Sequence, residues 1–208
     1  MNRAVFLDRD GVINELVYNK MTNEYEPPHK IEDIKIIDGV IKSLQNLQSS
    51  GYGLFIVSNQ PDYAKGKTGL ENLKEVHKEL QRILTRDKIF FKEYYYCFHH
   101  PMGVVNEYSV DCECRKPKPY FVLKAIEEYK IDSELSWFIG DRDSDISCGI
   151  SSGLKTILIK NEHSKNYLGK NEALFNLNNL KEASEIILKS ELNSGVLKNI
   201  TASNDKVI

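Results

Sequence analysis

Two carboxylates stand two residues apart, directly after a short apolar run. Asp8 and Asp10 follow residues 4–7, which read Ala-Val-Phe-Leu, and Gly11 comes next. Past the end of a buried strand both side chains can point into one crevice, where a metal ion would suppress their mutual repulsion. One carboxylate can attack phosphorus, and the other can protonate the leaving oxygen and later activate water. The alternative is an Asx-type turn that caps the strand end, because Asp-Gly is a common turn pair.

Two further polar clusters could hold a phosphoryl group. Ser58 and Asn59 offer a hydroxyl and backbone amides to phosphate oxygens, although an ordinary polar turn has the same composition. Arg115 and Lys116 precede a proline-stiffened helix start at residues 117–119. Two cations there would neutralise charge that builds on a transferring phosphoryl group. Taken alone, that run fits a solvated basic loop better.

An oxygen-rich cluster follows at residues 140–145, which read Gly-Asp-Arg-Asp-Ser-Asp. The glycine allows a tight turn after a strand, and several carboxylates come next. Oxygen ligands of this kind suit Mg²⁺. Asp141 is the best-placed metal ligand, and Asp145 either joins it or caps the following helix.

Three of the four cysteines fall in one short segment together with two histidines. Two pairs of soft ligands, each pair separated by one residue, suit a closed tetrahedral site for Zn²⁺, which would staple a loop that has no core of its own. The four candidate ligands are Cys97, His99, Cys112 and Cys114. His100 adjoins His99, so its side chain should point elsewhere, and Cys148 is expected in the core. The alternative is a set of buried or free thiols.

Apolar runs and helical periodicities alternate along the chain and predict where these clusters lie. Strands are predicted at residues 4–7, 52–57, 94–97, 137–139 and 156–159. Helices are predicted at residues 40–51, 70–84, 120–129, 145–151 and 180–188. This alternation is typical of an α/β fold with a parallel sheet and helices on both faces. Ligands bind such sheets beyond the carboxyl ends of the strands, where all of the clusters above fall.

Length and composition favour one domain. The 208 residues are 41% apolar and 28% charged, which allows one sizeable core. We predict a single domain at residues 1–192, with long loops at 14–36 and 98–119, and a frayed tail at 193–208. A net charge of −2 gives no basic excess for nucleic acid. No run approaches the roughly 20 apolar residues of a membrane span, and no signal peptide is recognisable, so a cytoplasmic protein is expected.

In this order and on this topology, the clusters resemble the four signature motifs of the haloacid dehalogenase (HAD) superfamily of phosphohydrolases. The resemblance covers about residues 3–160 and implies a Rossmann-like, HAD-like α/β fold. The motifs that carry it are Asp8-Arg9-Asp10-Gly11, Ser58-Asn59-Gln60, Lys116-Pro117 and residues 140–145. It implies that Asp8 is the nucleophile and Asp10 the general acid and base. Ser58 and Lys116 would hold the phosphoryl group, with Asn59 beside them. The implied Mg²⁺ ligands are Asp8, the backbone carbonyl of Asp10, and Asp141.

The cysteine segment narrows the resemblance to two related families. Its pattern, Cys-x-His followed by Cys-x-Cys-Arg-Lys-Pro, is similar to the D-glycero-D-manno-heptose 1,7-bisphosphate 7-phosphatases and to the histidinol-phosphatase domain of histidine biosynthesis. Both families lack a large cap domain. The heptose family is the closer match, and it implies hydrolysis of the 7-phosphate to heptose 1-phosphate through an aspartyl-phosphate, in surface-polysaccharide precursor synthesis. By the same resemblance, Arg115 would join Lys116 at the phosphoryl group and Arg142 would touch substrate.

Several alternatives stay open from the sequence. A histidinol-phosphate phosphatase or another small sugar-phosphate phosphatase has the same motifs, but Lys65, Lys67 and Arg115 suit a substrate with a second phosphate. A zinc-stapled binding module without activity would not need the complete set of motif residues. A DNA-end phosphatase is disfavoured by the net negative charge. Residues 61–66 depart from the Ser-Gly pattern common in the heptose family, which leaves the preferred anomer open. A monomer is expected.

Overall fold

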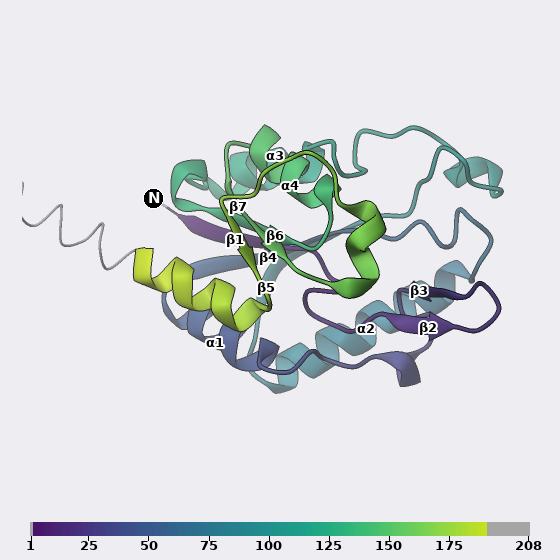
Figure 1. Cartoon of the computed structure of the whole chain (residues 1–208), viewed down its shortest axis with the longest axis horizontal. Coiled ribbons are helices and arrows are strands. Elements are labelled where there is room, and N and C mark those ends of the chain that lie inside the picture. The colour runs from purple at the N-terminus through teal and green to yellow at the C-terminus, as the bar shows by residue number, and fades with distance from the viewer. Residues whose placement is uncertain (1, 191–208) are drawn as a thin grey trace, which may run out of the picture.

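The chain folds around a six-stranded parallel sheet with helices on both of its faces (Figure 1). The computed structural model describes residues 2–190. The strands are β1 (Arg3–Leu7), β4 (Tyr52–Asn59), β5 (Phe91–Cys97), β6 (Trp137–Gly140), β7 (Lys155–Ile159) and β8 (Phe175–Leu177), in the order β5-β4-β1-β6-β7-β8. Because β4 and β6 flank β1 on opposite sides, strand order reverses at β1. The crevice beyond the carboxyl end of β1 is therefore the place where a sheet of this kind binds ligands.

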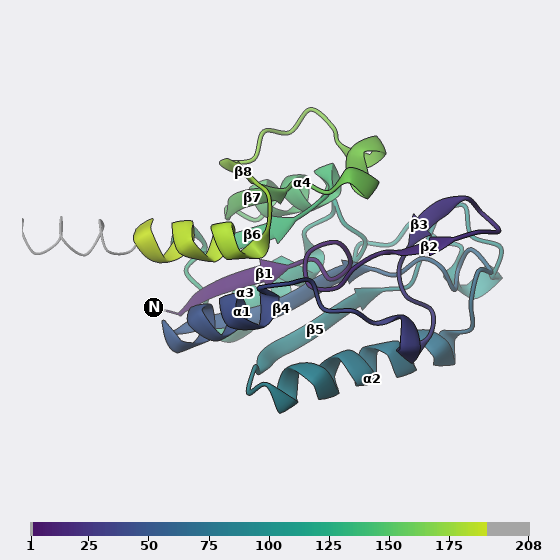
Figure 2. The same cartoon turned by 60° about the horizontal axis from the view of Figure 1, so that its bottom comes forward.

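Alternating side chains of β1 face two separate cores. Val5 and Leu7 pack with helices on one face of the sheet, while Ala4 and Phe6 pack with helices on the other. The first layer contains α1 (Val40–Ser49), α2 (Leu70–Arg86) and the helical residues 180–190, and the second contains α3 (Tyr120–Tyr129) and α4 (Asp143–Ser151) (Figure 2). A parallel sheet covered on both faces needs nearly continuous apolar strands, as β1 is. The predicted α/β architecture is confirmed.

Three short strands and several turns of 3₁₀ helix were not predicted. Strand β8 closes one edge of the sheet, and a hairpin of β2 (Val17–Asn19) and β3 (Glu24–Glu26) occupies part of the predicted loop at 14–36. Each of the three strands is only three residues long, too short to show an apolar period. The 3₁₀ turns are η1 (Ile31–Asp33), η2 (Asn106–Tyr108), η3 (Ser133–Leu135) and η4 (Glu162–Tyr167). Helix α4 begins at Asp143, two residues earlier than predicted.

The predicted tail at 193–208 lies outside the described residues. That residues 1–192 form a single domain stays a prediction. Within residues 2–190, no helix combines the length and the apolar composition that crossing a membrane would require.

Candidate active site

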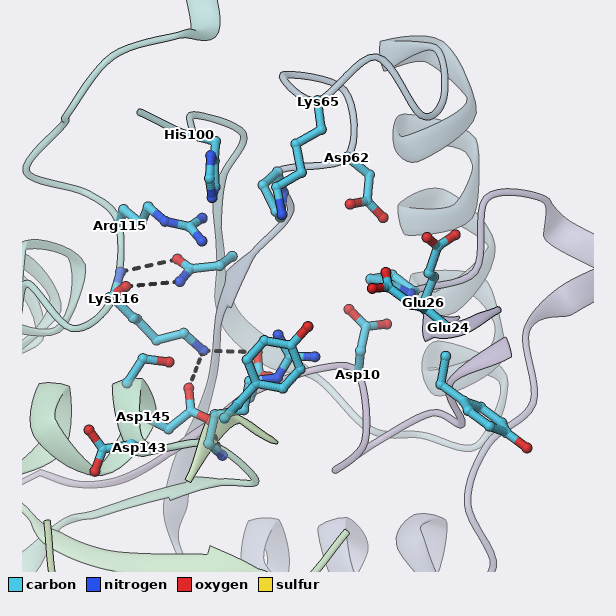
Figure 3. Close-up of a pocket in the computed structure, with 18 of the residues that line it drawn as sticks. Asp10, Glu24, Glu26, Asp62, Lys65, His100, Arg115, Lys116, Asp143 and Asp145 are labelled. Carbon is cyan, nitrogen blue, oxygen red and sulfur yellow. Dashed lines mark hydrogen bonds and ion pairs between the residues drawn. The ribbon is translucent and has the colours of Figure 1, made fainter. Parts of the chain in front are cut away.

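The polar clusters predicted from the sequence meet at the carboxyl edge of the sheet. Asp8 directly follows β1, Asn59 ends β4, and Gly140 ends β6. A cavity of about 420 Å³ opens at this edge (Figure 3). Its walls include Asp8, Asp10, Asn59, Arg115, Lys116 and Arg142, with Glu24, Tyr25 and Glu26 from the hairpin. The sheet therefore brings together residues that are far apart in the sequence, such as Asp8 and Arg142, which are separated by 134 positions.

Asp8 is held as a carboxylate by the ammonium group of Lys116. Lys116 is only 3% exposed, and its Nζ donates to Asp8 Oδ1 at 2.9 Å. Burial alone would raise the pKa of Asp8, but the charge and hydrogen bond of Lys116 outweigh it and leave this pKa below its usual value. Lys116 Nζ also lies 2.7 Å from Asp145 Oδ1 (Figure 3). Burial would lower the pKa of Lys116, but the charges of Asp145 and Asp8 raise it above its usual value. Asp8 and Lys116 therefore both stay charged at neutral pH.

Asp10 is oriented by three donors and does not join the carboxylate group around Asp8. Its Oδ1 accepts from Arg9 Nε at 3.0 Å and from Asn14 Nδ2 at 2.9 Å, and its Oδ2 accepts from Gln60 Nε2 at 2.6 Å. Arg9 is 1% exposed, and its guanidinium also donates to Gln60 Oε1. The carboxyl group of Asp10 is thereby fixed at the wall of the cavity, beside Asp8 but separate from it.

Sequence reasoning assigned no role to Arg9, Asn14 or Gln60. All three are buried and bond to Asp10 or to one another. An arginine between two aspartates, directly after a buried strand, is a signal that could have found Arg9, because a buried cation needs a partner. Nothing in the spacing of Gln60, 50 residues from Asp10, predicts their hydrogen bond.

Three buried carboxylates form a group that suits a divalent cation. Ligand oxygens of Asp8, Asp141 and Asp145 all lie within 4.8 Å of one another. Burial first, and then the charges of Asp8 and Asp145, raise the pKa of Asp141 to about 7. Asp141 is 0% exposed, and its Oδ1 has no hydrogen-bond partner among the described residues. Like charges around an unpartnered buried oxygen fit Mg²⁺, which prefers carboxylate ligands.

Asp145 caps the start of α4 and also lies in the carboxylate group; that it joins Asp141 as a metal ligand stays a prediction. Its Oδ2 accepts from the backbone N–H of Arg142 at 3.0 Å and so caps the start of α4. Its Oδ1 faces Lys116 within the carboxylate group. Asp145 therefore joins the helix start to the buried ion pairs.

Ser58 and Asn59, at the end of β4, lie next to the ion pair of Asp8 with Lys116. Ser58 is buried, and its hydroxyl accepts from Gln60 Nε2 at 3.0 Å. The side-chain amide of Asn59 makes two hydrogen bonds with the backbone of Lys116. Its Nδ2 donates to the carbonyl and its Oδ1 accepts from the N–H, each at 3.0 Å. This geometry makes Asn59 a support for Lys116. Asn59 also lines the cavity, and its predicted contact with phosphate or substrate stays a prediction.

Arg115 and Arg142 approach the cavity from two different elements. Arg115 comes from the cysteine-rich loop, where its Nη1 donates to the carbonyl of His99 at 3.3 Å. Arg142 stands at the start of α4, and its guanidinium carbon lies 4.3 Å from the ring centroid of Tyr167. Both cations line the cavity. Tyr167 also lines it, although no pattern in the sequence places it there.

The four predicted zinc ligands come together in one cluster. The Sγ atoms of Cys97 and Cys112 are 3.5 Å apart, those of Cys112 and Cys114 are 3.2 Å apart, and His99 Nδ1 lies 3.5 Å from Cys114 Sγ. Zinc–sulfur bonds of about 2.3 Å in a tetrahedral site imply ligand separations of about 3.8 Å. The cluster could therefore hold one ion at its centre. His100 and Cys148 stay outside the group, as predicted.

The cysteine cluster supports one wall of the cavity. The carbonyl of Ala64 accepts from the N–H groups of Val104 and Val105, at 2.7 and 3.1 Å. Tyr108 stacks on His99 and makes an edge contact with Tyr63. These contacts fix residues 61–67, the loop that follows β4.

The hairpin, and His29 shortly after it, contact the same loop on its other side. His29 Nε2 lies 2.8 Å from Asp62 Oδ2, and Lys67 pairs with Glu26 and Glu24 of β3. Glu26 is buried, whereas Lys67 is exposed, so this ion pair is only partly shielded from solvent. Residues 61–67 are therefore held between the hairpin and the cysteine-rich loop.

Loss of a cluster ligand should empty the metal site and loosen this wall. We expect Cys112→Ser to lose about one zinc per chain and to lower the melting temperature by roughly 5–10 °C, because a structural metal contributes folding free energy. Metal analysis and differential scanning calorimetry measure both. Cys148→Ala is the matched control, since Cys148 is a buried cysteine outside the cluster. Unchanged zinc content and melting in Cys112→Ser would contradict the assignment.

Comparison with known proteins places the chain among sugar-bisphosphate phosphatases. A sequence model of the HAD-hydrolase-like family matches residues 113–183. The chain is 38% identical to a D-glycero-beta-D-manno-heptose-1,7-bisphosphate 7-phosphatase from Haemophilus influenzae, over 74% of this chain and 79% of that protein. It is 34% identical to the protein of the same name from Pasteurella multocida, over 90% of this chain and 97% of that protein.

A solved structure shares the fold. The D,D-heptose 1,7-bisphosphate phosphatase from B. bronchiseptica, complexed with magnesium and phosphate, superposes with a TM-score of 0.73. The two chains are 19% identical, and the match covers 90% of this chain and 99% of the other. At this identity the likeness is evidence for the HAD-like fold alone.

Proposed function

Because the chain belongs to the D-glycero-beta-D-manno-heptose-1,7-bisphosphate 7-phosphatase family of HAD-like hydrolases, we propose that it removes the 7-phosphate from that heptose bisphosphate. The product is the heptose 1-phosphate, a precursor for surface polysaccharides. The structural observation that best supports the proposal is the buried ion pair of Asp8 with Lys116, which lines a polar cavity. An ionised carboxylate beside a fixed cation suits nucleophilic attack on phosphorus. A monomeric state and a cytoplasmic location stay predictions.

The chemistry we propose is a two-step displacement. An Asp8 carboxylate oxygen attacks phosphorus in line, and the bond from phosphorus to the sugar oxygen breaks as Asp10 protonates that oxygen. Asp10 then takes a proton from a water molecule, whose oxygen attacks the aspartyl-phosphate and releases inorganic phosphate. Lys116 neutralises charge on the phosphoryl oxygens in both steps. The arrangement of Asp10, which is fixed by Arg9, Asn14 and Gln60, supports its use as the acid and base.

Two metal ions belong to the proposal. Asp8, Asp141 and the backbone carbonyl of Asp10 would hold Mg²⁺, which when bound supplies positive charge opposite the phosphoryl oxygens. The unpartnered Oδ1 of Asp141 and the closeness of the three carboxylates support this assignment. Cys97, His99, Cys112 and Cys114 would hold Zn²⁺ in a structural role.

A second group of cations supports a substrate with two phosphates. Lys65, His100 and Arg115 line the cavity together with the acidic Asp62, Glu24 and Glu26, and Lys65 lies beside Asp62 (Figure 3). Burial, and then the like charges of Lys65 and Arg115, lower the pKa of His100. Burial lowers the pKa of Lys65, the charge of Asp62 opposes that effect, and the charges of Lys67 and Arg115 add to it. Within residues 2–190, no ion pair is recorded for Lys65. A bound phosphate could pair with the positive charges of Lys65 and Arg115.

The test is phosphate release in the presence of Mg²⁺ from three substrates: the β and α anomers of D-glycero-D-manno-heptose 1,7-bisphosphate, and histidinol phosphate. We expect kcat/KM for the β anomer to exceed that for histidinol phosphate by roughly 10³-fold or more, because a cationic amino alcohol would meet the cations of the second group. Comparable rates on histidinol phosphate would move the protein to the alternative family.

A variant of the second cation group sharpens this test. Lys65→Met should raise KM for the bisphosphate about 10-fold and leave the rate on the heptose 7-monophosphate nearly unchanged. Lys42→Met is the matched control, because Lys42 is exposed on α1 and does not line the cavity. Equal losses on both substrates would show that Lys65 does not contact the second phosphate.

A further inference from the structure

The segment that connects β7 to β8 folds back over the carboxylate group. Its 3₁₀ turn, η4, begins after Asn161, whose Oδ1 accepts from the N–H of His163 at 3.0 Å. This cap leaves the Nδ2 group of Asn161 pointing the other way, where it donates to Asp141 Oδ2 at 3.2 Å. The same turn brings Ser164, which is 0% exposed, to donate its hydroxyl hydrogen to the same oxygen.

The two oxygens of Asp141 thus have opposite surroundings. Oδ2 accepts from both Ser164 and Asn161, and the backbone of Gly11 packs against it so closely that a Cβ at position 11 would clash with it. Oδ1 is buried and has no hydrogen-bond partner among the described residues. Within residues 2–190, the nearest cationic atom to Oδ1 is Arg142 Nε, 4.0 Å away. All of the local donors therefore hold one oxygen and leave the other to the space shared with Asp8 and Asp145.

We propose that Ser164, assisted by Asn161, is a positioning residue that turns the free oxygen of Asp141 toward the metal ion. A carboxylate side chain has two rotatable bonds, so an unsupported Asp141 could pair with Lys116 or Arg142 and so leave the site. Two donors on Oδ2 remove that freedom before the ion binds. Partners of this kind typically change metal affinity by about 10–100-fold. The inference rests on the magnesium site of the proposed function but not on its sugar substrate.

The position of the supporting residues is specific to a turn that the sequence did not predict. Residues 160–172 lie between the predicted strand at 156–159 and the predicted helix at 180–188, and the serine there has no chemical pattern around it. Only the fold, which lays η4 over the end of β6, places its hydroxyl on Asp141. Ser164 touches neither the cavity nor the reacting atoms, so it acts through Asp141 alone.

The test measures metal binding without substrate. Mn²⁺, used as a spectroscopic probe, is titrated into the full chain and the free ion is followed by electron paramagnetic resonance. We expect Ser164→Ala to raise the Kd for Mn²⁺ by about 10-fold or more, and Asn161→Ala to raise it less, because Asn161 is less buried than Ser164. At saturating Mg²⁺, KM for the sugar phosphate should stay at the wild-type value. Asn161 is only half-buried, so we expect Asn161→Ala to fold. That variant can still test the proposal if Ser164→Ala does not fold.

Two controls separate the possible failures. Ser184→Ala removes another buried hydroxyl, one that donates to the carbonyl of Lys181 in the last helix, and should leave the Kd unchanged. A Kd in Ser164→Ala and Asn161→Ala equal to that of wild type, or an equal rise in Ser184→Ala, would overturn the positioning role. Asp141→Asn should abolish binding at this site. If it does not, the magnesium assignment itself is wrong and the inference falls with it.

Discussion

Asp8→Asn should lose turnover by about 10⁴-fold or more while the protein stays folded, because the amide cannot form an acyl phosphate. The fold should survive because the change does not strand a buried cation. Lys116 keeps Asp145 as a partner at 2.7 Å, and the carbonyl oxygen of an asparagine can still accept from its Nζ. The measurement pairs phosphate release under saturating Mg²⁺ with circular dichroism of the same preparation.

A second readout separates a nucleophile from a merely supporting carboxylate. Rapid acid quench with a ³²P-labelled substrate should trap label on the wild-type chain at Asp8, and Asp8→Asn should carry none. Asp132→Asn is the control, since Asp132 caps η3 and lies outside the cavity. Trapped label in Asp8→Asn, or a turnover within about 10-fold of wild type, would assign the attack to another group.

The sequence predicted the parts of the fold that are set by burial. Strand β1 is apolar from Ala4 to Leu7 because both of its faces are covered, so its run was recognisable without any tertiary information. The hairpin was not recognisable, because its strands read Val-Tyr-Asn and Glu-Tyr-Glu. It is held by ion pairs of Glu24 and Glu26 with Lys67, about 40 residues away, and by the stacking of Tyr25 on His163. Such contacts leave no local pattern.

In the candidate site, too, the sequence predicted where the motif residues lie but not what their side chains contact. Motif residues that follow strands, such as Asp8 and Asp141, could be placed at one edge of the sheet because the topology of a parallel sheet requires it. What each side chain contacts could not be predicted. Asn59 bonds to the backbone of Lys116, 57 residues away, and Ser164 bonds to Asp141, 23 residues away. These supports depend on the course of loops, whose geometry a single sequence does not specify. The catalytic roles themselves stay predictions.

Lys116→Met should impair both turnover and stability, since it removes the only cation recorded within 4 Å of Asp8 among residues 2–190. Breaking a buried ion pair by deleting one partner typically costs about 3–5 kcal/mol of unfolding free energy. Here two buried carboxylates, Asp8 and Asp145, lose their partner together. The loss of charge opposite the phosphoryl oxygens should lower kcat by about 10³-fold. Lys118→Met is the control, because Lys118 pairs only with exposed carboxylates, Asp111 and Glu113.

The pH dependence of this variant gives the sharper test, because its activity and its stability should move in opposite directions. Burial raises the pKa of Asp8, and in wild type Lys116 reverses that effect. Without Lys116, we expect burial to outweigh the hydrogen bond of Ser58 and the charge of Arg142, so that the folded-state pKa of Asp8 lies above the unfolded value and the folded chain binds more protons than the unfolded chain. The unfolding free energy of Lys116→Met, measured without added Mg²⁺, should then fall relative to wild type as pH rises from about 5 to 8. Residual kcat should rise over the same range as Asp8 ionises. A kcat ratio between variant and wild type that does not change with pH would show that Lys116 does not control the ionisation of Asp8.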